Sequence, residues 1–283
     1  MPHKNNIGDT IMAQTFRNYQ NSFTGTDEAD SVTLENGGGT IDMGAGNDAL
    51  WVTGGYVGDV SMGEGNDLFF LENGATAGSV DLGDGTNTVF ASDGGYIQTL
   101  TGGDDTDNVT LGNGAGSVDL GDGDNQLFAT DYVNSVTTGD GVDNVQLNDG
   151  GNTVDLGAGN DIFRASAYVN DVDTGAGDDS IETASGGVFD GGADDDTFNF
   201  DFADANGSNT RFDGGTGSDT LNINVDSFDD LDFSQLSADL ATYAQDGSAT
   251  LSQFNFDIEN VEAINVTVGS QTIETYDYGD VFG

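Results

Sequence analysis

The sequence has no cysteine, one proline, one histidine and four basic side chains among its 283 residues. Without cysteine there can be no disulfide, no thiolate nucleophile and no cysteine-ligated zinc site. The single histidine, His3, excludes a histidine-dependent catalytic triad and a two-histidine metal site. No apolar run reaches the length of about 18 residues that a transmembrane helix needs, so we expect no direct insertion into a membrane.

The scarcity of basic residues leaves 51 acidic side chains against four, a formal net charge of −47. Nucleic acid is therefore not an expected partner, because lysine and arginine supply phosphate binding. Carboxylates are so frequent that none forms a distinct catalytic pair, and few cations are available to stabilise an anionic transition state, so we expect no enzyme. Yet 35% of the residues are hydrophobic, which is too apolar for a disordered acidic tail. A compact chain of this charge calls for a neutralising cation.

A short motif, Gly-x-Gly-x-Asp, recurs along the chain. Complete copies are Gly44, Gly46 and Asp48; Gly63, Gly65 and Asp67; Gly139, Gly141 and Asp143; Gly157, Gly159 and Asp161; Gly175, Gly177 and Asp179; and Gly215, Gly217 and Asp219. Degenerate copies end at Asp30, Asn87, Asp107, Asn125 and Asp196. We call the last residue of each copy the closing residue. Closing residues follow one another at intervals of 17 to 23 residues, most often 18.

Apolar residues alternate with polar ones on both sides of each glycine turn. Leu50, Phe69 and Val89 stand two positions after a closing residue, and Ile41 and Val60 stand three before a first glycine. Period two is typical of half-buried strands. We therefore predict an all-β fold, a right-handed parallel β-solenoid with coils of about 18 residues over residues 25–222. Such short repeats must stack to bury their apolar side chains.

The second turn of each coil alternates between two types. One type contains Asn-Gly or Asp-Gly and the other contains tyrosine, at Tyr56, Tyr96, Tyr132 and Tyr168. Two interpretations stay open. In the first, the chain arose by duplication of a pair of coils, and each tyrosine packs over a glycine. In the second, the tyrosines form a recognition edge.

The glycine turn has the chemistry of a calcium site. Glycine permits the positive φ of a tight turn that exposes its carbonyls, and the closing aspartate adds a hard carboxylate oxygen. Calcium takes six to eight such oxygens, and without it the stacked aspartates repel one another, so binding and folding should be coupled. We predict several Ca²⁺ ions at these turns, with weaker or absent sites at Asn87 and Asn125. Alternatively, some turns are Asp-Gly or Asn-Gly turns held by their own hydrogen bonds.

Four segments resemble a known repeat: residues 44–50, 63–69, 157–163 and 175–181 are similar to the Gly-Gly-x-Gly-x-Asp-x-U-x nonapeptide of RTX (repeat-in-toxin) proteins. The resemblance implies a calcium-binding β-roll, with the final aspartate and turn carbonyls as ligands. It also implies type I secretion by an uncleaved C-terminal signal, and hence an extracellular location. Most copies here lack the doubled first glycine, and the second turn lacks the nonapeptide. We thus expect one good row of ions and at most a partial second row.

Outward positions predict two unlike faces. One is acidic and hydroxylated. The other presents Trp51, Phe70, Phe90 and Phe128 on four of five successive coils, with Thr110 at the equivalent position of the remaining coil; we call the four aromatics the aromatic ladder. Contiguous exposed apolar surface often marks a contact site, so we expect the ladder to mediate self-association or to pack on another chain. The alternative is that the aromatics shield a glycine-rich sheet.

The two ends differ from the array. Residues 1–24 are expected to cap the first coil or to serve in assembly. Residues 223–283 are expected to form a C-terminal cap, with near-helical spacing at 228–243, strands at 254–261 and 264–268, and an acidic-aromatic tail at 276–283 that is compatible with a secretion signal.

Together these patterns predict a secreted calcium-binding structural protein. It would fold on Ca²⁺ and self-assemble with further copies at the cell surface or in extracellular matrix. The alternative is a calcium-dependent adhesin or glycan-binding module, in which tyrosines or the aromatic ladder stack on sugar rings. A calcium buffer or secretion chaperone ranks third, and an enzyme last.

Overall fold

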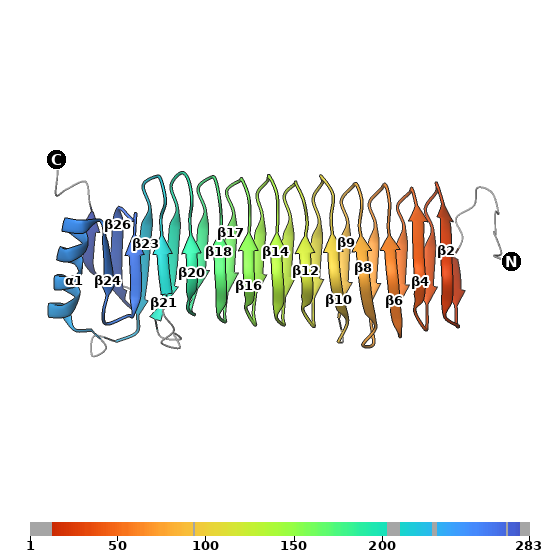
Figure 1. The fold of residues 1–283 in the computed structure, drawn as a ribbon, viewed down its shortest axis with the longest axis horizontal. Helices are drawn as coiled ribbons and strands as arrows, with labels where there is room; N and C mark the ends of the chain where they lie inside the picture. The colour runs from red at the N-terminus through yellow and green to blue at the C-terminus, as the bar shows by residue number, and fades with distance from the viewer. Residues whose placement is uncertain (1–12, 93, 203–209, 228–230, 270, 278–283) are drawn as a thin grey trace. The chain divides into compact units, whose positions relative to one another are not determined.

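The computed structural model describes residues 13–92, 94–202, 210–227, 231–269 and 271–277. These residues form 27 strands and one helix (Figure 1). Most of the strands belong to stacked parallel coils, about ten in all, so the predicted parallel β-solenoid with 18-residue spacing is confirmed. The chain divides into two compact units, Met1–Val133 and Asn134–Gly283.

In the first unit each coil contributes one strand to each of two parallel sheets. One sheet contains β1 (Ala13–Phe16), β3 (Ser31–Leu34), β5 (Ala49–Val52), β7 (Leu68–Leu71), β9 (Thr88–Ala91), β11 (Asn108–Leu111) and β13 (Gln126–Ala129). The other contains β2 (Gln20–Thr26), β4 (Gly38–Gly44), β6 (Tyr56–Ser61), β8 (Thr76–Asp81), β10 (Tyr96–Thr101) and β12 (Ala115–Asp119). The boundary between the units falls within β14 (Val133–Thr137).

The second unit repeats this arrangement. One sheet runs through β15 (Asn144–Leu147), β17 (Ile162–Ala165), β19 (Ser180–Thr183), β21 (Thr197–Asp201), β23 (Thr220–Val225), β26 (Ala263–Val268) and β27 (Gln271–Asp277). The other runs through β16 (Gly151–Asp155), β18 (Val169–Asp173), β20 (Gly187–Asp190), β22 (Thr210–Asp213), β25 (Phe256–Glu259) and β24 (Ser248–Leu251).

The core of each unit lies between its two sheets. Pairing is parallel and in register, so a repeat position lies beside its own copy in the next coil, as in Leu50, Phe69 and Val89. These side chains are fully buried, and Ile41 and Val60 are buried from the opposite sheet. The period-two pattern thus fills the interior because alternate side chains of a strand point to opposite faces.

The coils extend beyond the array that the motif defines. Residues 13–24, expected as a cap or assembly segment, form β1 and most of β2, which pair in parallel with β3 and β4. Residues 1–12 lie outside the described part. At the other end, β25 and β26 continue the parallel pairing of β22 and β23. Coil geometry therefore tolerates sequences that lack the Gly-x-Gly-x-Asp turn.

The C-terminal segment combines a helix with antiparallel strands. The helix α1 (Phe233–Asp246) begins at Asp232, whose carboxylate accepts hydrogen bonds from the backbone of Ser234 and Gln235, and ends at Gly247 in left-handed conformation. It buries Leu236, Leu240 and Tyr243. β24 pairs antiparallel with β25, and β27 pairs antiparallel with β26. Of the tail predicted at 276–283, the first two residues end β27 and the rest lies outside the described residues. No helix in the described part is long and apolar enough to cross a membrane.

Candidate metal centre

The turns require glycine at the predicted positions. Gly44 and Gly46 have φ of 100° and 129°, and Gly63 and Gly65 have 104° and 132°. A Cβ at Gly63 or Gly65 would overlap the carbonyl oxygen of the matching glycine one coil earlier. Gly217 is needed for room alone, because its Cβ would overlap the Asp194 carbonyl while its φ lies outside the left-handed region.

The closing residues of the turns form a buried hydrogen-bonded row, which we call the inner ladder. In each bond of this row, the backbone N–H of one closing residue donates to the Oδ1 atom of the next closing residue. In the first unit these bonds join Asp30 to Asp48, Asp48 to Asp67, Asp67 to Asn87, Asn87 to Asp107 and Asp107 to Asn125 at 2.7–3.0 Å. In the second unit they join Asp143 to Asp161, Asp161 to Asp179, Asp179 to Asp196 and Asp196 to Asp219 at 2.7–2.9 Å.

Where the acceptor is an aspartate, the bond of the inner ladder uses one carboxylate oxygen, Oδ1, and leaves Oδ2. The buried Oδ2 atoms of Asp48, Asp67, Asp107, Asp161, Asp179, Asp196 and Asp219 have no hydrogen-bond donor. Burial raises the pKa of Asp48 to about 6 and that of Asp161 to about 7, because desolvation disfavours the charged form. A buried carboxylate oxygen without a partner costs free energy, so a row of them indicates that a positive group belongs beside it.

The two turns that close on asparagine are satisfied differently. Asn87 Nδ2 donates to the carbonyl oxygens of Gly83 and Gly85 at 3.3 and 2.8 Å. Asn125 Nδ2 donates to those of Gly121 and Gly123 at 3.1 and 3.0 Å. In these two turns the first- and third-position carbonyls therefore converge on the side chain of the closing residue.

The first closing residue of the first unit, Asp30, and the last closing residue of the second unit, Asp219, have hydrogen-bond partners that lie outside the row. Asp30 Oδ2 accepts hydrogen bonds from the backbone N–H and the hydroxyl of Thr26 at 2.8 and 3.0 Å, so the oxygen that lacks a donor at the other aspartate turns has two donors here. At the other end, the backbone N–H of Asp219 donates to Glu262 Oε2 at 2.7 Å. Sequence reasoning missed Glu262, because it lies 43 residues downstream, outside any copy of the motif.

A second row of hydrogen bonds, which we call the outer ladder, joins neighbouring turns on their solvent-exposed side. These bonds involve the residue immediately before each closing residue. Its side-chain oxygen accepts a hydrogen bond from the backbone N–H of the residue at the same repeat position in the next coil. The bonds run from Asn66 to Asn47, Thr86 to Asn66, Asp178 to Asn160, Asp195 to Asp178 and Ser218 to Asp195, at 2.9–3.2 Å. The two ladders point in opposite senses, so each fixes the spacing of neighbouring turns.

The donor set fits calcium. Among the described residues no three acidic or histidine side chains gather as a metal cluster. Each aspartate turn instead offers one carboxylate oxygen together with backbone carbonyls, which are hard oxygen donors of the kind that Ca²⁺ prefers. Asp48, Gly44 and Gly46 exemplify the set that would hold an ion.

The second turns place tyrosine over glycine. A Cβ at Gly78 would lie 2.5 Å from Tyr56 Oη, and one at Gly116 would lie 3.2 Å from Tyr96 Oη. These two tyrosines therefore pack over a glycine of the next coil, as one of the two open interpretations expects. The rings keep considerable exposure, 52% at Tyr56 and 46% at both Tyr132 and Tyr168.

The aromatic ladder is a stacked column in the first unit. Trp51 and Phe70 stack at 5.3 Å between ring centroids with an interplanar angle of 1°, and Phe70 and Phe90 at 5.6 Å and 15°. Thr110 lies between Phe90 and Phe128 in the strand register. Because the stacked rings cover one another's faces, this column presents mainly ring edges outward.

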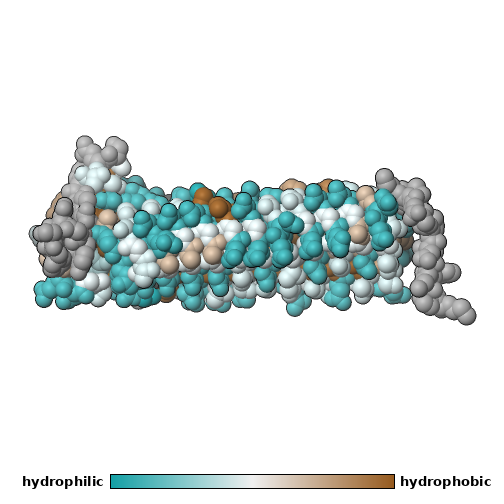
Figure 2. Space-filling view, turned by 90° about the horizontal axis from the view of Figure 1, so that it is seen from above, coloured by the Kyte–Doolittle hydropathy of each residue, from teal (hydrophilic) through white to brown (hydrophobic). Residues whose placement is uncertain are grey.

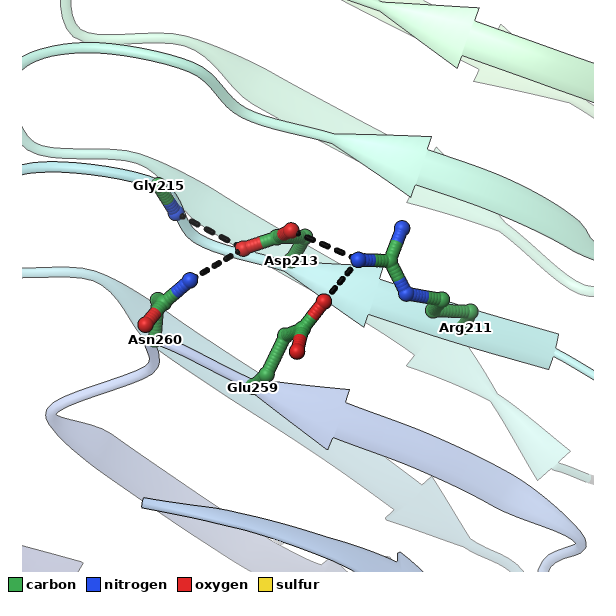
Figure 3. A network of polar contacts seen from close by, with 5 residues as sticks. All are labelled: Arg211, Asp213, Gly215, Glu259 and Asn260. Carbon is green, nitrogen blue, oxygen red and sulfur yellow. Dashed lines mark hydrogen bonds and ion pairs between the residues drawn. The ribbon is translucent and has the colours of Figure 1, made fainter.

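The acidic face also appears, with an arginine at one end of it. In the second unit Asp155, Asp173, Asp190, Asp213 and Glu259 are aligned in adjacent strands. Arg211 pairs with both Asp213 and Glu259, and Asn260 and the backbone of Gly215 donate to Asp213 (Figure 3). Burial and like charges raise the pKa of Asp173 and Asp190. Figure 2 shows one face of the molecule, which is largely hydrophilic with small apolar groups.

No protein-family model, curated protein or solved structure matches this chain.

Proposed function

We propose that this protein is a calcium-binding structural protein whose coils are completed by Ca²⁺ at the aspartate turns. The observation that carries the proposal is the row of buried Oδ2 atoms with no donor. A cation at each aspartate turn would contact Oδ2 and the two turn carbonyls, and would supply the positive charge that the buried carboxylates lack. Asp30 is not among the proposed ligands, because Thr26 satisfies its second oxygen.

The similarity of the turns to the RTX nonapeptide supports the same proposal and extends it. On that similarity the chain is a member of the RTX class of β-roll proteins, leaves the cell by type I secretion and works outside it. Extracellular fluid is rich in calcium, so folding would be delayed until export. The proposed role is structural rather than catalytic.

The proposed structural role includes self-assembly through the sheet that carries the aromatic ladder. Outward positions of β3 to β13 are Ser31, Thr33, Ala49, Trp51, Leu68, Phe70, Thr88, Phe90, Asn108, Thr110, Gln126 and Phe128, none of them charged. Two copies of a chain with a net charge of −47 repel one another elsewhere. This face is where a second copy can approach without facing like charge.

Calcium titration tests the metal-binding part of the proposal. Chelator-treated protein is titrated with Ca²⁺ while circular dichroism follows β-structure and isothermal titration calorimetry counts ions. We expect β-structure to rise with calcium and several ions to bind per chain. An ion-free chain that is already fully β-structured and takes up no calcium would refute the proposal.

A fourfold variant of the aromatic ladder tests self-assembly. Trp51, Phe70, Phe90 and Phe128 are changed to threonine, which suits strands and already occupies position 110. Light scattering of calcium-loaded protein should show assembly in the parent chain and its loss in the variant, with an unchanged far-ultraviolet spectrum. A matched control changes Gln146 and Asn199, which hold the equivalent row in the second unit, to threonine. An unaltered assembly state in the fourfold variant rejects this surface.

A calcium-dependent adhesin is the second candidate, favoured by the exposure of Tyr56, Tyr132 and Tyr168. Stacking on sugars needs accessible ring faces. Trp51 and Phe70 stack on one another, so the ring faces that they turn toward each other are covered. Calcium-dependent binding of a monomer to a glycan array, abolished by changing these three tyrosines to serine, would favour the adhesin.

A further inference from the structure

Two turns of the first unit close on a side chain that contains a donor, an amide, where the aspartate turns have a carboxylate. The amides of Asn87 and Asn125 each donate to both converging carbonyls of their own turn. Their Oδ1 atoms still accept the N–H of the preceding closing residue, exactly as an aspartate Oδ1 does in the inner ladder. Asparagine therefore keeps the ladder bond and replaces only the second oxygen.

The replaced atom is the one proposed to meet the cation. Asparagine Nδ2 and aspartate Oδ2 are attached to the same carbon and differ in sign, because the amide carries partial positive charge and two protons. In an aspartate turn the carboxylate oxygen and the carbonyl oxygens are all acceptors. In an asparagine turn the amide supplies the donor that these carbonyls need.

The backbone conformation of the two asparagine turns differs from that of most aspartate turns. In the asparagine turns the first glycines, Gly83 and Gly121, have φ of 73° and 70°, and the third-position glycines, Gly85 and Gly123, have 107° and 104°. In four of the six complete aspartate turns, at 44–48, 63–67, 157–161 and 175–179, the first glycine has φ of 92–104° and the third 125–153°, whereas Gly217 of the turn at 215–219 lies outside the left-handed region. The two asparagine turns thus share one backbone shape, which differs from the shape of these four aspartate turns.

We propose that the side-chain amides of Asn87 and Asn125 take the place of the cation, so that these two turns fold without metal. This inference rests on the proposed calcium sites at the aspartate turns. The second unit closes its motif turns on aspartate throughout, at Asp143, Asp161, Asp179, Asp196 and Asp219. Calcium removal therefore loosens the second unit more than the coils around Asn87 and Asn125.

Exchange of the closing residues tests the inference, with bound Ca²⁺ counted by equilibrium dialysis. Asn87→Asp and Asn125→Asp should each gain one ion per chain and lower the Tm in chelator. Asp67→Asn should lose one ion and raise the Tm in chelator. Asp42→Asn and Asn134→Asp, which make the same charge changes at exposed strand positions, should leave the ion count unchanged.

The outcomes distinguish a failure of this inference from a failure of the proposed calcium sites at the aspartate turns. A parent chain that binds no calcium refutes the calcium sites themselves. A parent chain that binds calcium, while Asp67→Asn keeps every ion and its Tm in chelator does not rise, refutes only the role of the amides. If Asn87→Asp does not fold, Asp67→Asn decides alone. Hydrogen exchange in chelator gives a second readout, in which turns at 83–87 and 121–125 should exchange more slowly than turns of the second unit.

Discussion

A closing aspartate divides its two oxygens between two tasks. In Asp67, Oδ1 accepts the backbone N–H of Asp48, while Oδ2 is buried without a donor. The first task needs only an acceptor, so asparagine performs it as well, as Asn87 does for Asp67. The second task needs negative charge, and only there do aspartate and asparagine differ.

Glycine is hardest to replace where a Cβ would overlap a neighbouring backbone atom and φ is also positive. Gly65→Ala should cost roughly 3 kcal/mol, because its Cβ meets the Gly46 carbonyl and its φ is 132°. Gly74→Ala is the matched control, with a φ of 71° but nothing within 4 Å of its Cβ, and should cost about 1 kcal/mol. Urea unfolding in saturating calcium measures both. Equal losses would mean that conformation alone, and not room, decides these positions.

At the scale of the element, the inner ladder links turn stability to pH. Burial raises the pKa of Asp67 to about 6 and that of Asp196 to about 7, against an ordinary value of 3.8 in the unfolded chain. A raised pKa means that the folded state binds the proton more tightly. The stabilisation is therefore complete below pH 3.8 and is lost as the pH rises through 6 to 7.

In chelator we accordingly expect the Tm to fall between about pH 4 and pH 7. In saturating calcium the trend should reverse, because Ca²⁺ and protons compete for the same oxygens. Asp161→Asn should flatten the profile in chelator, since the pKa of Asp161 is raised to about 7. A Tm in chelator that stays constant or rises with pH would contradict this account.

Strand pairing also aligns like charges, and Arg211 offsets them at one end. Arg211→Met should cost about 1 kcal/mol or less, because the guanidinium is partly exposed and the pairs are screened by solvent. The loss should shrink in 0.5 M NaCl, a concentration at which the Debye length is only a few ångströms. Arg17→Met, whose pair with Glu35 is 3.8 Å long and whose side chain is 81% exposed, should change nothing measurable. Equal effects of both variants in urea unfolding would exclude a special role for Arg211.

At the scale of the whole molecule, the net charge of −47 sets the cost of compaction. Salt would relieve this repulsion by screening, whereas bound calcium would relieve it at the turns. Each ion adds two positive charges, so seven ions at the donor-free aspartates would bring the charge to −47 + 14 = −33.

Because salt would only screen the charges whereas calcium would bind at the turns, we expect the chain to respond selectively to different ions. Millimolar Ca²⁺ should restore β-structure in the chelator-treated chain, while Mg²⁺ at equal concentration should not, because Mg²⁺ demands a stricter octahedral geometry and keeps its waters. NaCl at 0.5 M should restore less structure than calcium, because it screens without filling the turns. Circular dichroism under the three conditions checks the order. Equal recovery in all three would show that screening alone suffices.

The sequence by itself determined the coil. An interval near 18 residues, period-two apolar positions and paired glycines leave stacked parallel strands as the arrangement that buries Leu50, Phe69 and their counterparts. The same reasoning predicted a helix near 228–243, and α1 occupies Phe233–Asp246. It could not place residues 13–24 in a coil, because strand pairing there depends on backbone register and not on the turn motif.

Only the tertiary structure decided how the oxygens of the turns are used. Sequence spacing brings Asp48 and Asp67 to neighbouring coils, but stacking aims one oxygen at a backbone N–H and buries the other. It likewise turns the amide of Asn87 onto its own carbonyls, satisfies Asp30 through Thr26 and ends the row at Glu262. Hydrogen bonding depends on directions between atoms of different coils, and those directions exist only once the coils are stacked.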